Sequence, residues 1–157
     1  MKPTVICDLD GTLSDSSHRQ HFMQAKKKNW VAFYAGLVDD PPNHDILWMI
    51  KTWHADGATI LYASGRPEEY RTVTLNQLNN FNAPARTVPG LYPKTEFPLY
   101  MRKTGDYRPD YVVKLELLEQ MKADGYSPNL ALDDRDQVVK AWRSVGIRCL
   151  QVADGKF

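Results

Sequence analysis

Short apolar runs alternate along the chain with longer amphipathic segments. The apolar runs cover residues 3–7, 58–63, 98–101, 129–133 and 147–152. Near-continuous apolar runs of this length are typical of strands that are buried on both faces. The amphipathic segments cover residues 44–57, 67–81, 111–125 and 135–146. Strands that alternate with helices predict an α/β fold, in which helices cover both faces of a parallel sheet.

The amphipathic segments carry ordinary helix boundary signals. Segment 44–57 repeats apolar residues at helical spacing and ends at Gly57. Segment 67–81 opens with Pro67, which we expect at the first helical position. The two later segments also end at glycine, a common residue just beyond a helix C-terminus.

Residues 13–43 fit neither pattern. They contain a basic cluster and three aromatic residues: Lys26, Lys27, Lys28, Trp30, Phe33 and Tyr34. We expect one or two short helices here, inserted after the first strand as a small cap. The chain as a whole is then expected to be one domain of residues 1–157, with the cap insertion within residues 13–56.

Composition narrows the function classes. The formal net charge is +1, so any nucleic-acid surface would have to be local. No apolar stretch approaches the ~20 residues that cross a bilayer. The first residues run directly into a strand, which leaves no room for a signal peptide. Cys7 and Cys149 lie in apolar runs and are expected to be buried free thiols. We therefore expect a cytoplasmic protein with no membrane association.

The segment Asp8-Leu9-Asp10-Gly11-Thr12 places two carboxylates at the end of the first strand. Like charges this close raise one pKa unless a cation neutralises them. Magnesium prefers oxygen ligands and takes one or two carboxylates with waters and a phosphate. A carboxylate can also attack phosphorus, while a neighbouring carboxylic acid protonates the leaving oxygen and later activates water. The alternative for this segment is an ordinary Asp-Gly turn.

Two further strands end on residues suited to phosphate and metal. Ser64-Gly65-Arg66 precedes a predicted helix, so a hydroxyl, backbone N–H groups and a helix N-terminus would form a phosphate cradle. Arg66 could instead be a surface residue. Asp133 and Asp134 end the fourth strand, and one of them would bind the metal directly. The alternative for this pair is a helix N-cap with an acidic first turn.

Two cationic residues lie near these strand ends in the sequence. Lys114 falls in the first turns of a predicted helix, where it would balance phosphate and carboxylate charges. Its alternative is a solvated helical lysine, the commoner fate. Arg102 follows the third strand. Because ligands bind at the carboxyl ends of strands in open α/β sheets, we expect these groups to meet at one crevice.

The motifs DLDGT (8–12), SGR (64–66), Lys114 and DDR (133–135) resemble, in order and spacing, those of the haloacid dehalogenase superfamily of phosphotransferases. The resemblance implies a Rossmann-like, three-layer α/β fold and a magnesium-dependent phosphatase that forms an aspartyl-phosphate. Caps in this superfamily choose the substrate.

Longer segments resemble the 3′-phosphatase domain of T-even bacteriophage polynucleotide kinases: residues 8–19, 62–71, 101–114 and 132–157. That resemblance implies removal of 3′-phosphates from DNA or RNA ends, as in nucleic-acid repair, with Asp8 as nucleophile and Asp10 as general acid. The implied catalytic residues are Asp8, Asp10, Arg19, Ser64, Arg66, Arg102, Asp110 and Lys114. The implied magnesium ligands are Asp8, Asp10, Asp133 and Asp134. The implied substrate contacts are Thr12, Ser64, Gly65, Arg66 and Arg102.

The departures from that family bear on the substrate. No GxxxxGK[ST] loop occurs, so we expect a phosphatase without a kinase half. No obligate protein partner is evident from the sequence. Residues 20–56 match poorly. The basic and aromatic residues of 26–34 would suit single-stranded ends, or else form a solvated helix face over core aromatics. A nucleotidase acting on free nucleoside monophosphates and a non-enzymatic phosphate- or nucleic-acid-binding module are the competing hypotheses.

Overall fold

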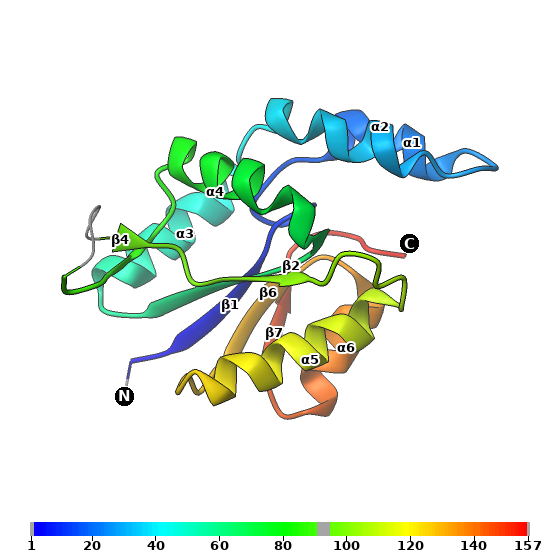
Figure 1. Ribbon diagram of the computed structural model, residues 1–157. Coiled ribbons are helices and arrows are strands. Elements are labelled where there is room, and N and C mark those ends of the chain that lie inside the picture. Colours follow the sequence, from blue (N-terminus) through cyan, green and yellow to red (C-terminus); the bar gives the residue numbers. More distant parts are fainter. Residues whose placement is uncertain (1, 91–94, 157) are drawn as a thin grey trace.

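A five-stranded parallel sheet forms the centre of the computed structural model, which describes residues 2–90 and 95–156 (Figure 1). Its strands are β1 (Thr4–Asp8), β2 (Thr59–Pro67), β5 (Leu99–Arg102), β6 (Leu130–Asp133) and β7 (Arg148–Gln151). Their spatial order is β5-β2-β1-β6-β7, and every neighbouring pair is parallel. The five apolar runs therefore predicted the sheet correctly.

Two helical layers cover the sheet. The helices α3 (His44–Ala55) and α4 (Arg71–Asn80) lie on one face, and α5 (Asp110–Ala123) and α6 (Asp136–Ser144) lie on the other (Figure 1). Alternate side chains of β1 pack into the two helical layers: Val5 packs on the α3 side of the sheet and Ile6 on the α5 side. This arrangement confirms the predicted three-layer α/β class.

The predicted start of the helix at Pro67 is wrong. Pro67 has extended backbone, with φ of −61° and ψ of 150°, and is the last residue of β2. A 3-10 turn, η3 (Glu68–Tyr70), follows it, and α4 begins only at Arg71. The strand continues to Pro67 through a shift in register between Ser64 and Pro67, and the Arg66 side chain within this stretch is buried.

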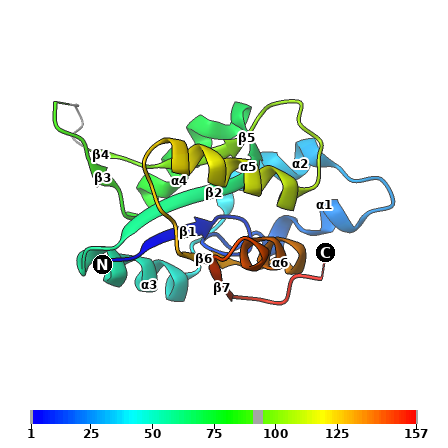
Figure 2. The same ribbon diagram turned by 90° about the horizontal axis from the view of Figure 1, so that it is seen from below.

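Residues 13–43, here called the cap segment, form short helical pieces rather than a layer of the core. They are η1 (Ser17–Arg19), α1 (His21–Gln24), α2 (Trp30–Ala35) and η2 (Gly36–Asp39). Figure 2 shows α1 and α2 at the end of the molecule toward which β1 runs, opposite the N-terminus. The cap segment therefore lies at the carboxyl edge of the sheet.

Three smaller points complete the fold. A two-stranded antiparallel ribbon, β3 (Arg86–Thr87) and β4 (Thr95–Glu96), was not predicted from the sequence. Cys7 and Cys149 are buried free thiols, as expected. No helix within the described ranges, 2–90 and 95–156, is long and apolar enough to cross a bilayer.

Candidate active site

A buried lysine joins two carboxylates at the carboxyl edge of the sheet. Lys114, in the second turn of α5, donates to Asp8 Oδ1 at 2.7 Å and to Asp133 Oδ2 at 2.7 Å. Lys114, Asp8 and Asp133 are 1 %, 5 % and 1 % exposed. Trp142 of α6 also donates to Asp133, at 3.3 Å. Lys114 is thus an internal counter-charge and not a solvated helical lysine.

A third carboxylate completes an acidic group. Asp8, Asp133 and Asp134 each offer an oxygen, and these oxygens lie within 4.8 Å of one another. Asp134 Oδ1 is buried and has no hydrogen-bond partner among residues 2–90 and 95–156. Gly11, at φ +82°, permits this approach, because a Cβ there would collide with the Asp134 carboxylate. Three carboxylates against one ammonium leave two negative charges, which a divalent cation such as magnesium would neutralise.

The pKa values follow from this charge imbalance. Burial raises the pKa of Asp8 well above its ordinary value, and Asp133 and Asp134 add to the rise against the opposing effect of Lys114. Burial and Asp133 raise the pKa of Asp134 to about 6. Burial opposes the charge on Lys114, but Asp133, Asp8 and Asp110 outweigh burial and raise the pKa of Lys114. The acidic group therefore favours a bound cation over its own ionised, metal-free state.

Magnesium is expected to raise the thermal unfolding midpoint, because a ligand of the folded state stabilises that state. The rise should be larger at about pH 7.5 than at about pH 5, since a proton must leave Asp134 before the metal binds. Without metal, the raised pKa of Asp134 contributes stability at low pH that is lost as the pH rises through about 6. Thermal scans with and without magnesium measure both effects.

The test variant is Asp134→Asn, and its matched control is Asp56→Asn. Asp134→Asn should lose most of the magnesium-dependent shift, whereas Asp56→Asn, at a surface carboxylate that is 81 % exposed, should keep it. Equal shifts in Asp134→Asn and the unaltered protein would show that magnesium binds elsewhere.

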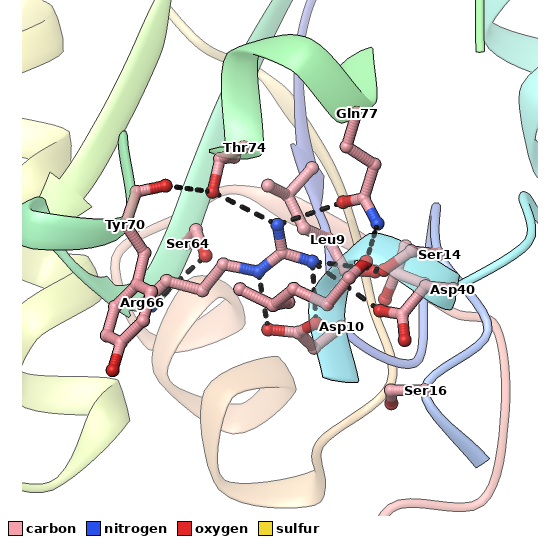
Figure 3. Close-up of polar contacts among 12 residues, drawn as sticks. Leu9, Asp10, Ser14, Ser16, Asp40, Ser64, Arg66, Tyr70, Thr74 and Gln77 are labelled. Atoms are coloured by element: carbon pink, nitrogen blue, oxygen red, sulfur yellow. Dashed lines mark hydrogen bonds and ion pairs between the residues drawn. The ribbon is translucent and has the colours of Figure 1, made fainter. Parts of the chain in front are cut away.

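Asp10 lies beside this group, but its carboxylate faces two arginines, of which Figure 3 shows Arg66. Arg66 donates to both oxygens of Asp10, at 2.9 and 2.7 Å, and Arg19 donates to Oδ1. Burial favours the neutral acid, but Arg66 and Arg19 outweigh burial and lower the pKa of Asp10 to about 2. Within the described residues, the side chain of Asp10 is not part of the acidic group formed by Asp8, Asp133 and Asp134.

The arginine pair has a second counter-charge that sequence reasoning missed. Asp40, which is 5 % exposed, accepts from Arg19 Nε at 2.7 Å and Nη2 at 2.6 Å. It also lies 3.8 Å from Arg66 Nη2, and the half-exposed His18 contacts it at 2.8 Å. The only signal in the sequence was an acidic pair before two prolines, which does not reveal burial.

Arg66 has protein partners for its whole guanidinium. Nη1 donates to Thr74 at 3.1 Å and to Gln77 at 2.9 Å, and Nη2 also reaches Ser14 at 3.3 Å (Figure 3). Arg66 is 1 % exposed, so the alternative hypothesis that it is a surface residue is wrong. The Ser64 hydroxyl accepts from the Arg66 N–H at 3.1 Å, and because α4 starts at Arg71, no helix N-terminus follows the motif directly.

Two other predicted site residues, Arg102 and Asp110, form an ion pair. Arg102 donates to the Gly65 carbonyl at 2.8 Å and pairs with Asp110 at 3.2 Å, while Asp110 lies 3.5 Å from the Lys114 ammonium. A Cβ at position 65 would collide with Asp110, so glycine allows this close approach.

The Thr12 hydroxyl is buried and has no hydrogen-bond partner in the part of the chain that the structure describes.

These groups meet at a cavity of about 580 Å³ between the sheet edge and the cap segment. Asp8, Asp10, Gly65, Arg102, Asp110 and Asp134 contribute to its wall. The cap segment contributes Gln20, Met23, Lys28, Trp30, Phe33 and Tyr34. The described wall does not include the other predicted residues, which are buried behind it: Thr12, Arg19, Ser64, Arg66, Lys114 and Asp133.

The model of one protein family, the polynucleotide kinase PNKP phosphatase domain, matches residues 2–157. The chain belongs to this family. It has the haloacid dehalogenase-like phosphatase fold that the four motifs implied.

Individual relatives of this PNKP phosphatase domain are longer proteins. Over 144 residues it is 25% identical to a protein of Autographa californica nuclear polyhedrosis virus provisionally named a bifunctional polynucleotide kinase/RNA ligase. That match covers 91% of this chain and 18% of the viral protein. A chain in the structure of a Pnkp1/Rnl/Hen1 complex is 31% identical to this one and superposes with a TM-score of 0.74. That match covers 100% of this chain and 48% of the chain in the complex. The domain thus spans less than half of these relatives.

The fold extends to more distant phosphatases. A class C acid phosphatase from Bacillus anthracis, solved with tungstate bound, matches the PNKP phosphatase domain with a TM-score of 0.67 and 14% identity. The match covers 99% of this chain and 68% of that one. At this identity it shows a shared fold alone.

Proposed function

We propose that this domain removes 3′-phosphates from DNA or RNA ends by magnesium-dependent hydrolysis, and that residues 1–157 are one domain. The observation that carries the reaction is the Asp8 carboxylate, held by Lys114 beside Asp133 and Asp134 at the cavity. Membership in the PNKP phosphatase family supports the polynucleotide substrate.

In the proposed first step, the ionised Asp8 carboxylate attacks phosphorus and forms an acyl–phosphate bond. The bond between phosphorus and the 3′ oxygen of the nucleic acid breaks, and Asp10 gives that oxygen a proton. Asp10 is ionised in the structure because Arg19 and Arg66 hold its pKa low. Phosphate oxygens that draw these arginines away would raise the pKa of Asp10, which the acid role requires.

In the proposed second step, Asp10 accepts a proton from water as the water attacks the aspartyl-phosphate. Inorganic phosphate leaves and Asp8 is regenerated, and the proton that Asp10 gains from water balances the one that it gave to the leaving oxygen in the first step. Arg66 and Arg19 keep Asp10 ionised at neutral pH, so its carboxylate is available to accept that proton.

Asp8, Asp133 and Asp134 would hold magnesium, which when bound supplies positive charge against the transferring phosphoryl group. Gly65 and Arg102 line the cavity and are proposed as phosphate contacts. Thr12 and Ser64 are proposed in the same role from the family pattern, and both lie buried next to wall residues.

The expected result of a substrate comparison is magnesium-dependent phosphate release from a 3′-phosphorylated oligonucleotide. The same oligonucleotide phosphorylated only at its 5′ end is the matched control and should release at least about tenfold less. A rate on the 3′ end no greater than that on small aryl phosphates would refute the polynucleotide proposal.

The competing activity is hydrolysis of free nucleoside monophosphates, because a cavity of about 580 Å³ is large enough for a whole mononucleotide. Comparing kcat/KM for 3′-mononucleotides and 3′-phosphorylated oligonucleotides separates the two. A preference for mononucleotides of about tenfold or more would favour this second activity.

A further inference from the structure

The cavity has an apolar side that phosphate chemistry does not use. Met23, Trp30, Phe33 and Tyr34 of the cap segment line it, across from the carboxylates of the sheet edge. At about 580 Å³ the cavity is within the range of sites that enclose organic ligands. The part of the substrate that remains attached to the phosphate therefore has an apolar, aromatic surface beside it.

Trp30 is the exposed member of this surface. It is 50 % exposed, whereas Phe33, one turn along α2, is 7 % exposed. A large indole that lines a cavity is available to contact a ligand bound there. Single exposed aromatics also occur elsewhere on this protein, so exposure alone does not distinguish Trp30.

Two neighbouring rings of the cap segment pack against the indole. Trp30 is stacked on Tyr34, with ring centroids 5.8 Å apart and planes at 22°, and meets Phe33 edge-on at 6.1 Å. Tyr34 packs in turn against Tyr70, which follows the sheet edge, at 4.6 Å. The Asn29 side chain caps α2 by accepting from the Ala32 N–H at 3.1 Å. Trp30 is thus a preorganised flat surface, which lowers the cost of binding.

A cation and the catalytic residues lie next to that surface. Lys28 also lines the cavity, and its Nζ lies 5.7 Å from the Trp30 ring. The Arg19 guanidinium, which binds Asp10, lies 4.2 Å from the centroid of the Phe33 ring. Lys28 lies over the Trp30 ring in the free protein, so a nucleobase that stacks on the ring would take its place while the long lysine side chain turns to the adjoining backbone phosphate.

We propose that Trp30 stacks on the nucleobase of the terminal, 3′-phosphorylated nucleotide while Lys28 faces the adjoining backbone phosphate. This inference rests on the proposed function and adds a subsite to it. Stacking of this kind tolerates any base, because every base offers a π-face. The platform would therefore select nucleotides over other phosphomonoesters without selecting a sequence.

The test compares Trp30→Ala with Trp48→Ala on two substrates. Trp48, on α3, is 69 % exposed and is not part of the described cavity wall, so it is the matched control. The substrates are a 3′-phosphorylated oligonucleotide and the same oligonucleotide with an abasic 3′-phosphorylated terminal residue. For the base-bearing substrate, Trp30→Ala should raise KM about tenfold with little change in kcat, and Trp30→Phe should restore most of the loss.

The abasic substrate separates stacking from a structural role. We expect Trp30→Ala to leave its KM within about twofold, and the unaltered enzyme to bind it about tenfold more weakly than the base-bearing one. Equal losses on both substrates, or no loss on either, would overturn the stacking subsite; the latter outcome would leave Trp30 free for a protein partner. If the unaltered enzyme releases no phosphate from the base-bearing oligonucleotide, the proposed function itself fails.

Discussion

Asp8→Asn is expected to leave a folded protein without measurable turnover. The carboxamide cannot form the acyl–phosphate, so kcat/KM should fall at least about 1,000-fold, or roughly 4 kcal/mol of transition-state stabilisation. The fold should persist, because the change removes one negative charge from a buried group that has an excess of them. The unfolding midpoint without metal should therefore stay equal or rise.

Phosphate release and thermal unfolding measure the two effects separately. Asp56→Asn, at an exposed carboxylate far from the cavity wall, should match the unaltered enzyme in both. Residual Asp8→Asn activity within about tenfold of the unaltered enzyme would refute the nucleophile assignment. Retention of every measurable function by Asp8→Asn would instead support a non-enzymatic binding module.

Lys114→Met is expected to damage stability and turnover together. Removing the ammonium leaves Asp8 and Asp133 buried without their common cation. Breaking a buried pair in this way costs about 3–5 kcal/mol of unfolding free energy. Turnover should be lost as well, because Lys114 lowers the pKa of Asp8 against the effect of burial and holds its carboxylate in position.

Metal and pH distinguish this explanation from simple loss of packing. Magnesium should recover part of the lost stability, since it supplies the missing positive charge. The deficit should also shrink as the pH falls from about 7.5 to about 5, because carboxyl groups with raised pKa values become neutral. Lys122→Met, on the same helix but at a side chain that is 52 % exposed, is the control. A deficit no larger than that of Lys122→Met would contradict the counter-charge role.

Much of the fold could be predicted because four of the five strands of the main sheet are mostly buried; β7, at the sheet edge, is largely exposed. Residues 3–7 and 130–132 carry short apolar runs, so they could be identified without knowledge of their partners. The residues at their carboxyl ends could then be expected at one edge. The β3–β4 ribbon could not, because each strand has only two residues and both are exposed.

The site could be predicted only in part, because sequence shows which side chains are charged and not which charges are paired. The strand ends indicated that Asp8, Asp133 and Asp134 would meet. They did not indicate that Asp10 would turn to Arg66, since that pairing joins residues 56 positions apart. Asp40 was missed for the same reason, because its partner Arg19 is 21 positions away.

The cap segment carries part of the environment of Asp10, and this limits how caps can be exchanged among relatives. Arg19 and Asp40 both belong to that segment, yet Arg19 reaches the carboxylate at the end of the sheet. A chimera that replaced the segment with one lacking either residue would leave a buried charge without its partner. Diversification of the substrate is therefore expected to proceed through surface positions of the cap, such as Met23, Lys28 and Trp30, while the buried pair is inherited together.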